Sequence, residues 1–137
     1  MSKEINLEAQ KKFGEAVNTE NWDLINEVVA PDAIDHDPAP GQVQGPEGYI
    51  TFFKQFRAAF PDLKVELVQL IADEDNIAFA YEITGTHGGD FLGIPPTNKP
   101  IKARGVQISK FKDGKIIERW GSSDVLGILT QIGQELK

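Results

Sequence analysis

The chain has 137 residues, of which 40% are hydrophobic and 26% charged, with a formal net charge of -7. This length favours a single domain over residues 1–137. The acidic balance and the scattered Lys and Arg residues argue against a nucleic-acid partner, which needs clustered positive charge. No apolar run is long enough for a membrane span, the polar start lacks the features of a secretory signal, and there is no cysteine, so the cytoplasm is the default location.

Apolar residues in the first part of the chain recur at helical spacing. They predict helices over 5–18 and 21–29, and Pro31 ends the second. The segment 31–46 is rich in Pro, Gly and Asp, which is typical of a loop. A third helix is predicted from Pro46, which suits a first turn, to a stop at Pro61.

From Lys64 onward the apolar period changes to that of strands. Alternation predicts strands over 64–72 and 77–87. A Gly- and Pro-rich loop over 88–100 follows, and then two strands are joined by Asp113-Gly114, a pair typical of hairpin turns in which both residues have positive φ. A final helix is predicted from about Asp124 to Leu136.

This order of elements indicates an α+β fold. We expect the three N-terminal helices to pack on the concave side of a curved antiparallel sheet, which gives a cone with an internal pocket. The loop 88–100, with Phe91, Leu92 and Ile94, is expected to border the mouth of that pocket. The other sheet face would leave Val106, Ile108 and Ile117 in water, which predicts a homodimer.

Two residues are candidates for acid/base catalysis in such a pocket. His87 lies at the end of a mainly apolar strand face, where it either exchanges protons near neutral pH or simply binds the loop that follows. Asp124 either acts as a base whose pKa is raised beside Trp120 or caps the last helix. With a two-residue turn Gln107 pairs opposite Trp120, and strict alternation places both on one face with Glu118 and Asp124, unless there is a bulge at 121–123.

Other residues are candidates for contact with a ligand rather than for chemistry. His36 lies between two aspartates, but one His without Cys or a second His is a poor metal site, so we expect no metal there. No phosphate-binding Gly loop, nucleophile elbow or dinucleotide fingerprint is present, so no cofactor is expected. The predicted ligand-binding residues are His36, Phe56, Tyr81, Phe91, Gln107 and Trp120.

Five segments carry a family resemblance: HDP at 36–38, AAFPDL at 58–63, GTHGGDFLGIPPTNK at 85–99, FKDGKIIERW at 111–120 and DVLGILTQIG at 124–133. Through them the chain resembles the SnoaL-like polyketide cyclases, or ester cyclases, over nearly its full length. The resemblance implies the α+β cone shared with nuclear transport factor 2, scytalone dehydratase and ketosteroid isomerase, and dimers or higher oligomers. It also implies cofactor-free ring closure by intramolecular aldol condensation.

The resemblance further implies an acid/base Asp after the ERW-like segment and an assisting His on the preceding strand. These positions are Gly121 and Gln107 here, and neither side chain exchanges protons. Any base would have to be Asp124, His87 or His36, and we expect aldol cyclase activity to be absent or weak. Two functions stay open. One is a cofactor-free enzyme of cyclase, isomerase or hydratase type acting on a small apolar or aromatic carbonyl-bearing molecule. The other is a non-catalytic ligand-binding or interaction protein.

Overall fold

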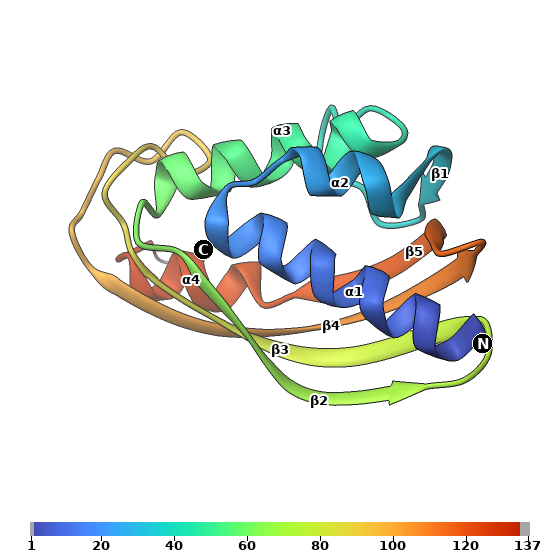
Figure 1. Ribbon diagram of the computed structural model, residues 1–137. Helices are drawn as coiled ribbons and strands as arrows, with labels where there is room; N and C mark the ends of the chain where they lie inside the picture. The colour runs from blue at the N-terminus through green and yellow to red at the C-terminus, as the bar shows by residue number, and fades with distance from the viewer. Residues whose placement is uncertain (1, 135–137) are drawn as a thin grey trace.

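A single five-stranded sheet with helices packed against it forms the computed structural model, which describes residues 2–134 (Figure 1). The strands lie in the order β1-β5-β4-β3-β2. The elements in chain order are α1 (Ser2–Thr19), α2 (Asp23–Val28), β1 (Val29–Asp35), α3 (Pro46–Ala59), β2 (Lys64–Ala72), β3 (Asn76–Thr86), β4 (Pro100–Lys112), β5 (Lys115–Ser123) and α4 (Val125–Gln131).

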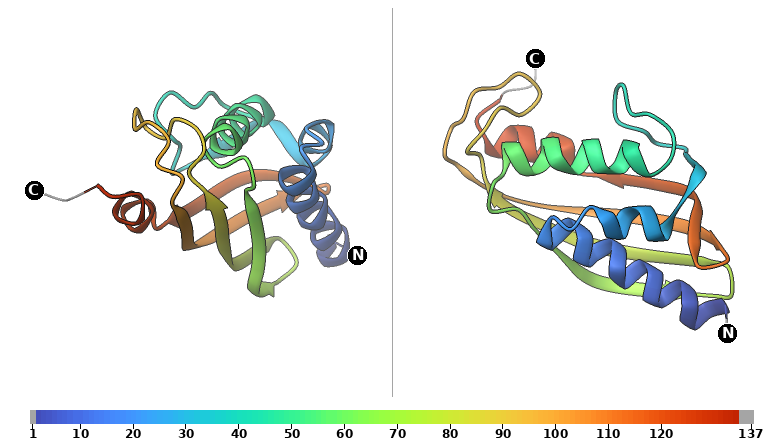
Figure 2. Two further views of the ribbon diagram at one scale, coloured as in Figure 1. Left: turned by 90° about the vertical axis from the view of Figure 1, so that its left-hand side faces the viewer. Right: turned by 45° about the horizontal axis from the view of Figure 1, so that its top comes forward.

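The α+β cone expected from the sequence is confirmed. Helices α1, α2 and α3 cover the concave face of the curved sheet, while α4 lies at one end of it (Figures 1 and 2). Strands β2 to β5 pair antiparallel, as the alternating pattern predicts. The helix and strand bounds agree closely with the predicted ones, except that α4 ends at Gln131 and Leu136 lies outside the described residues.

Strand β1 corrects the prediction that residues 31–46 form a loop throughout. It pairs in parallel with β5 and brings Asp35 opposite Arg119, so the sheet is mixed rather than wholly antiparallel. Pro31 hid this strand from pattern reasoning, since proline cannot donate to a ladder and is confined to edge strands. β1 is such an edge strand.

Two hydrophobic clusters hold the helices on the sheet. The first joins α1, α2, β1 and α3 to sheet residues such as Ile77 and Ile116. The second joins the end of α3 to α4 through Phe60, Ile83 and Ile128. Each fully buried aliphatic or aromatic side chain of this kind contributes about 1.5–3 kcal/mol relative to exposure, so the clusters fix the walls between which a cavity remains.

The β4–β5 hairpin turns at Asp113 and Gly114, whose φ angles of 53° and 75° match the prediction. The strands then depart from strict alternation. Lys110 pairs with Glu118 but Phe111 pairs with Ile116, so Ile117 is an extra, bulged residue.

That bulge corrects the predicted facing of β5. Gln107 pairs with Gly121 instead of Trp120. Trp120 pairs with Ile108 on the convex face and is 37% exposed, whereas Arg119 points to the concave side. A bulge cannot be seen in a sequence whose alternation continues on both sides of it.

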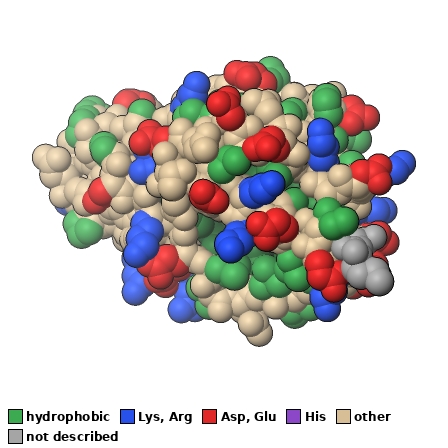
Figure 3. Space-filling model, in the orientation of Figure 1, with side chains coloured by type: hydrophobic (Ala, Val, Ile, Leu, Met, Phe, Trp, Pro, Cys, Tyr) green, Lys and Arg blue, Asp and Glu red, His purple; other side chains and the backbone are tan. Residues whose placement is uncertain are grey.

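The convex face of the sheet keeps part of the expected apolar surface. Val106 and Ile108 are 55% and 42% exposed, as predicted, but Ile117 packs against the first hydrophobic cluster because of the bulge. Elsewhere, acidic and basic side chains are interspersed over the face shown in Figure 3. Within residues 2–134 no helix has the length and apolar character needed to span a membrane.

Candidate functional site

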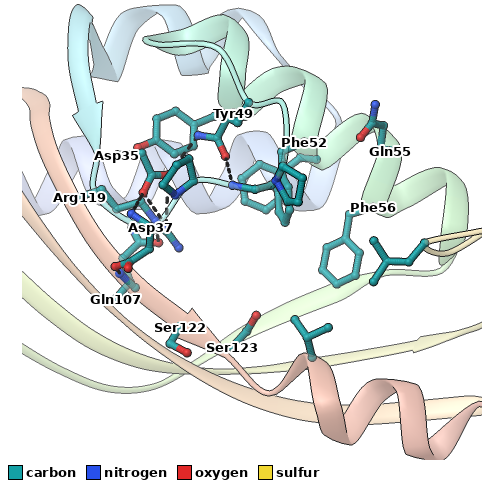
Figure 4. Close-up of a pocket in the computed structure, with 18 of the residues that line it drawn as sticks. Asp35, Asp37, Tyr49, Phe52, Gln55, Phe56, Gln107, Arg119, Ser122 and Ser123 are labelled. Carbon is teal, nitrogen blue, oxygen red and sulfur yellow. Dashed lines mark hydrogen bonds and ion pairs between the residues drawn. The ribbon is translucent and has the colours of Figure 1, made fainter. Parts of the chain in front are cut away.

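A cavity of about 880 Å³ lies between α3 and the concave face of the sheet. Its walls come from α3, the loop after β1, the loop 88–100, strands β4 and β5, and α4. Figure 4 shows Phe52 and Phe56 on one side, and Ser122 and Ser123 on the other. A concave, mainly apolar space with several polar groups is typical of a small-molecule site. Its aromatic lining consists of Phe13, Tyr49, Phe52, Phe53, Phe56 and Phe91.

The polar groups gather at one end of the cavity around Arg119 (Figure 4). Its Nη1 donates to both carboxylate oxygens of Asp35, at 3.1 and 3.2 Å, and its Nε donates to Oε1 of Gln107 at 2.9 Å. Gln107 in turn donates to Oγ of Ser109 at 3.0 Å. The Arg119 and Asp35 side chains are 17% and 7% exposed. This charge-assisted network therefore holds the guanidinium in one orientation.

The loop after β1 completes this end of the cavity. The backbone N–H of Asp37 donates to Oδ1 of Asp35 at 2.9 Å, and Nε2 of Gln42 donates to Oδ2 at 3.0 Å. Asp37 reaches across to β5, where its Oδ2 accepts from the backbone N–H of Gly121 at 2.9 Å. The side chain of Asp37 thus ties the loop to the backbone of β5 at the polar end.

Tyr49 of α3 lies beside this network and is 4% exposed. Burial raises the pKa of its hydroxyl far above the usual range, the nearby Asp35 carboxylate raises it further, and Arg119 opposes the change. The hydroxyl faces Asp35, yet it makes no hydrogen bond of ordinary geometry with any described residue. Tyr49 is therefore a neutral hydrogen-bond donor lining the cavity.

Three of the six residues predicted to contact a ligand line the cavity, and a fourth lies on the same sheet face. Phe56, Phe91 and Gln107 line the cavity. Tyr81 lies on the same sheet face, with its ring over Gly105, where a Cβ would collide with the ring. Burial raises the pKa of the Tyr81 hydroxyl, and the nearby Arg119 and Ser123 oppose this.

The loop 88–100 borders the cavity as expected. Asp90, Phe91 and Leu92 line it, while Ile94 packs into the second hydrophobic cluster. The loop thus covers the end of the cavity away from Arg119.

His36 and Trp120 lie outside the cavity lining. Their rings stack with centroids 4.5 Å apart, and Nε2 of His36 lies 3.0 Å from Oε1 of Glu118. The bulge at Ile117 explains this placement, because it turns Trp120 and Glu118 to the convex face together. Among residues 2–134 no group of three or more His, Cys, Asp or Glu side chains could hold a metal ion.

His87 and Asp124, the two predicted catalytic residues, do not line the cavity either. His87 is fully buried against Phe60, and its Nδ1 accepts from the backbone N–H of Thr97 at 3.2 Å, which ties the loop to β3. Asp124 caps α4, with Oδ1 accepting from the N–H of Gly127 at 2.8 Å. For both residues the structure shows the second of the two roles that the sequence left open: His87 binds the loop after β3, and Asp124 caps α4.

Sequence reasoning missed four residues of the polar end. Asp35 and Asp37 flank His36, and no local pattern marks them as residues of a pocket. Strict alternation puts Trp120 on the pocket face and therefore Arg119 on the other, which the bulge at Ile117 reverses. Tyr49 shares the helical spacing of the other aromatic residues of α3, which is typical of core positions. The parallel pairing of β1 with β5 is what brings these side chains together: Asp35, Asp37, Tyr49 and Arg119.

The comparisons of this chain with known proteins agree with one another. Residues 7–132 match the family described as SnoaL-like polyketide cyclase. The aklanonic acid methyl ester cyclase DauD of Streptomyces sp. strain C5 is 26% identical over 98% of this chain and 84% of its own length. The nogalonic acid methyl ester cyclase of Streptomyces nogalater is 28% identical over 86% of this chain and 90% of its own.

Solved structures agree with this assignment. IdmH from Streptomyces antibioticus superposes with a TM-score of 0.83 at 28% identity, covering 94% of this chain and 99% of that one. TsrD from Streptomyces laurentii shares the fold, with a TM-score of 0.88 at 22% identity over 97% of this chain and 98% of its own. The match to the family over nearly the whole chain, on a cone with an internal cavity, shows that this protein belongs to the SnoaL-like polyketide cyclase family.

Proposed function

We propose that this protein binds a small, mainly apolar, carbonyl-bearing molecule of the polyketide type and promotes proton transfer next to its carbonyl group without a cofactor. One observation carries the proposal: an aromatic-lined cavity of about 880 Å³ has a fixed guanidinium and a buried tyrosine hydroxyl at one end. Aromatic walls would hold the flat part of such a molecule, and the polar end would receive its oxygen.

Arg119 is suited to bind that oxygen. Two of its nitrogens are committed to Asp35 and Gln107, while Nη2 donates to none of the described residues. A donor that is already held in place stabilises charge as it develops on an oxygen, with no cost of reorganisation. The hydroxyl of Tyr49 lies buried beside Asp35, next to the guanidinium that Asp35 holds.

The relatives support the type of substrate. The names of DauD and of the Streptomyces nogalater protein describe cyclases that act on aklanonic and nogalonic acid methyl esters. We propose that the ligand of this chain is a molecule of that kind, with aromatic and carbonyl groups, because the cavity has aromatic walls and a fixed guanidinium donor at one end.

A second function rests on a different observation. Gln107 and Gly121 carry no proton-transfer group, and the catalytic candidates His87 and Asp124 lie away from the cavity. The same pocket without turnover would make this a ligand-binding protein. Fold alone does not separate the two, since one fold hosts many functions.

The experiment compares wild type with Arg119→Met and with a matched control, Arg104→Met. Arg104 lies exposed on the sheet beside Glu82, away from the cavity. Calorimetry measures binding of aklanonic and nogalonic acid methyl esters. Ring closure is followed by chromatography with mass detection. An intramolecular aldol product keeps the mass of its substrate, so it is detected as a new peak of unchanged mass.

We expect wild type and Arg104→Met to bind alike and Arg119→Met to bind at least tenfold more weakly, the loss of about one hydrogen bond to a charged group. Conversion of the bound ester supports the enzyme, and binding without conversion supports the ligand-binding alternative. Absence of binding by wild type to either ester, or equal binding by both variants, contradicts the proposal.

We also propose a cytoplasmic homodimer as the working form. The exposed apolar side chains of Val106 and Ile108 on the convex face support the dimer. The cavity lies on the opposite, helix-covered side of the sheet, so that such an interface would not cover it.

A further inference from the structure

Two carboxylates stand at the polar end of the cavity, and Asp35 is committed to holding Arg119. Its Oδ1 accepts from the N–H of Asp37 and from Nη1 of Arg119, and its Oδ2 accepts from Gln42 and the same Nη1. Each of its two oxygens therefore already accepts two hydrogen bonds from other residues of the network. Asp35 is therefore a positioning residue.

Asp37 is bound differently. Its Oδ2 accepts a single hydrogen bond, from the backbone N–H of Gly121 at 2.9 Å, and its Oδ1 accepts none from residues 2–134. The side chain lines the cavity and is exposed to it, at the same end as Asp35, Arg119 and Gln107 (Figure 4). Of the two carboxylates, Asp37 alone has an oxygen free to accept a proton from a bound molecule.

Gly121 brings this carboxylate close to the guanidinium. A Cβ at Gly121 would lie 2.6 Å from Nη2 of Arg119, so that nitrogen lies directly against the glycine that also binds Asp37. A proton acceptor from the loop after β1 and a cationic donor from β5 thus both lie beside Gly121 at the polar end of the cavity. Removal of a proton next to a carbonyl needs this pairing of a base with a donor for the oxygen.

We propose that Asp37 is the catalytic base of this site. Its role toward the natural substrate rests on the proposed function. Oδ1 of Asp37 takes a proton from the carbon next to the carbonyl group. The electron pair of the broken C–H bond forms the enolate, whose oxygen accepts from Nη2 of Arg119. The proton then returns from Asp37 to the product, which leaves the enzyme unchanged.

A probe reaction tests the base independently of any polyketide. In 5-nitro-1,2-benzisoxazole, a base removes the ring C–H proton, the N–O bond breaks, and a coloured cyanophenolate forms. This reaction needs only a positioned base in an apolar cavity. The variants are Asp37→Asn, whose amide oxygen can still accept from Gly121, Asp37→Glu, which keeps the carboxylate, and Asp124→Asn, a carboxylate outside the cavity.

We expect wild type and Asp124→Asn to open the ring with equal kcat and KM. In Asp37→Asn, kcat should fall about 10²-fold or more, the range that general-base catalysis supplies, while KM stays unchanged. Asp37→Glu should recover part of the rate. Thermal unfolding by circular dichroism sets an assay temperature at which every variant is folded.

Equal kcat in wild type and Asp37→Asn would overturn the assignment, and so would a rate no faster than buffer in wild type. The outcome is separable from that of the proposed function. Loss of ring opening in Asp37→Asn, in a protein that binds neither methyl ester, keeps Asp37 as the base and removes the polyketide proposal. If the esters bind but ring opening does not depend on Asp37, the polyketide proposal is kept and Asp37 is removed as the base.

Discussion

The guanidinium of Arg119 occupies the space that a side chain at Gly121 would need, since a Cβ on that glycine would lie 2.6 Å from Nη2 and 2.9 Å from Cζ. The residues are two positions apart on the concave side of β5, and Gln107 connects to both, by pairing with Gly121 and by accepting from Nε of Arg119. The identities of these three residues are therefore physically coupled. A larger residue at 121 and an arginine held as it is here exclude one another.

The first prediction follows from that exclusion. Gly121→Ala should lower the free energy of unfolding by about 1–3 kcal/mol, the usual cost of overpacking, because the guanidinium must move off Asp35 or Gln107. In an Arg119→Met background the same change should cost less. Urea unfolding of the four members of this cycle measures the coupling. Additive effects would show that the guanidinium does not fill the space at 121.

How far the sequence predicts this site depends on the kind of signal involved. Period-two alternation and the Asp113-Gly114 turn predict the antiparallel strands, since both are local features. The aromatic spacing of α3 predicts a helix with an apolar face, and Phe56 on that helix lines the cavity. The order of these elements predicts the α+β cone, and the family resemblance implies the same fold.

What the sequence did not predict depends on non-local pairing. The polar end exists because β1 pairs in parallel with β5 across about eighty positions of sequence, Asp35 opposite Arg119. No local pattern reports such a contact, and Pro31 argues locally against a strand. The bulge at Ile117 then decides that Arg119, and not Trp120, faces the cavity. One inserted residue turns every side chain after it to the opposite face of the sheet.

A second prediction concerns the two tyrosines, the only ones in the chain. Burial raises the pKa of both Tyr49 and Tyr81 above the ordinary value of 10.0. Their neutral forms are thus favoured by the fold, and the stability this contributes is present below the unfolded pKa and is lost as pH rises above it. An absorbance titration of the folded protein near pH 10 should show little phenolate, and denaturant should release the full signal of both.

The unfolding free energy provides the control for this titration. Between pH 9 and 11 it should fall more steeply in wild type than in Tyr49→Phe, because the folded state then binds more protons than the unfolded one. Ordinary titration of both phenols in the folded protein, with the same pH dependence in the variant, would contradict the burial of the hydroxyls.

The third prediction tests the convex face of the sheet. Val106→Lys together with Ile108→Lys should leave the fold intact, since both side chains are largely exposed in the single chain. If that face forms the dimer, two added charges per subunit should shift light scattering at micromolar concentration from dimer to monomer. Val43→Lys is the matched control, because Val43 is 56% exposed in the loop after β1. A wild-type monomer would remove the prediction.

The last prediction separates Asp124 from catalysis. Its Oδ1 accepts from the N–H of Gly127 and satisfies one of the unpaired donors at the start of α4. Asp124→Ala should therefore lower the free energy of unfolding by about 1 kcal/mol, the typical cost of a lost cap. Asp124→Asn should cost much less, since asparagine caps about as well as aspartate.

Activity gives the contrasting result. Ring opening of the benzisoxazole should have the same kcat in both Asp124 variants, measured at a temperature where each is folded, because the residue does not line the cavity. If Asp124 were a base, the result would differ. Asp124→Asn would then lose activity as completely as Asp124→Ala, although its cap and stability are kept. That pattern would move the proton-transfer role from Asp37 to the start of α4, and it would mean that α4 shifts toward the cavity when a ligand binds.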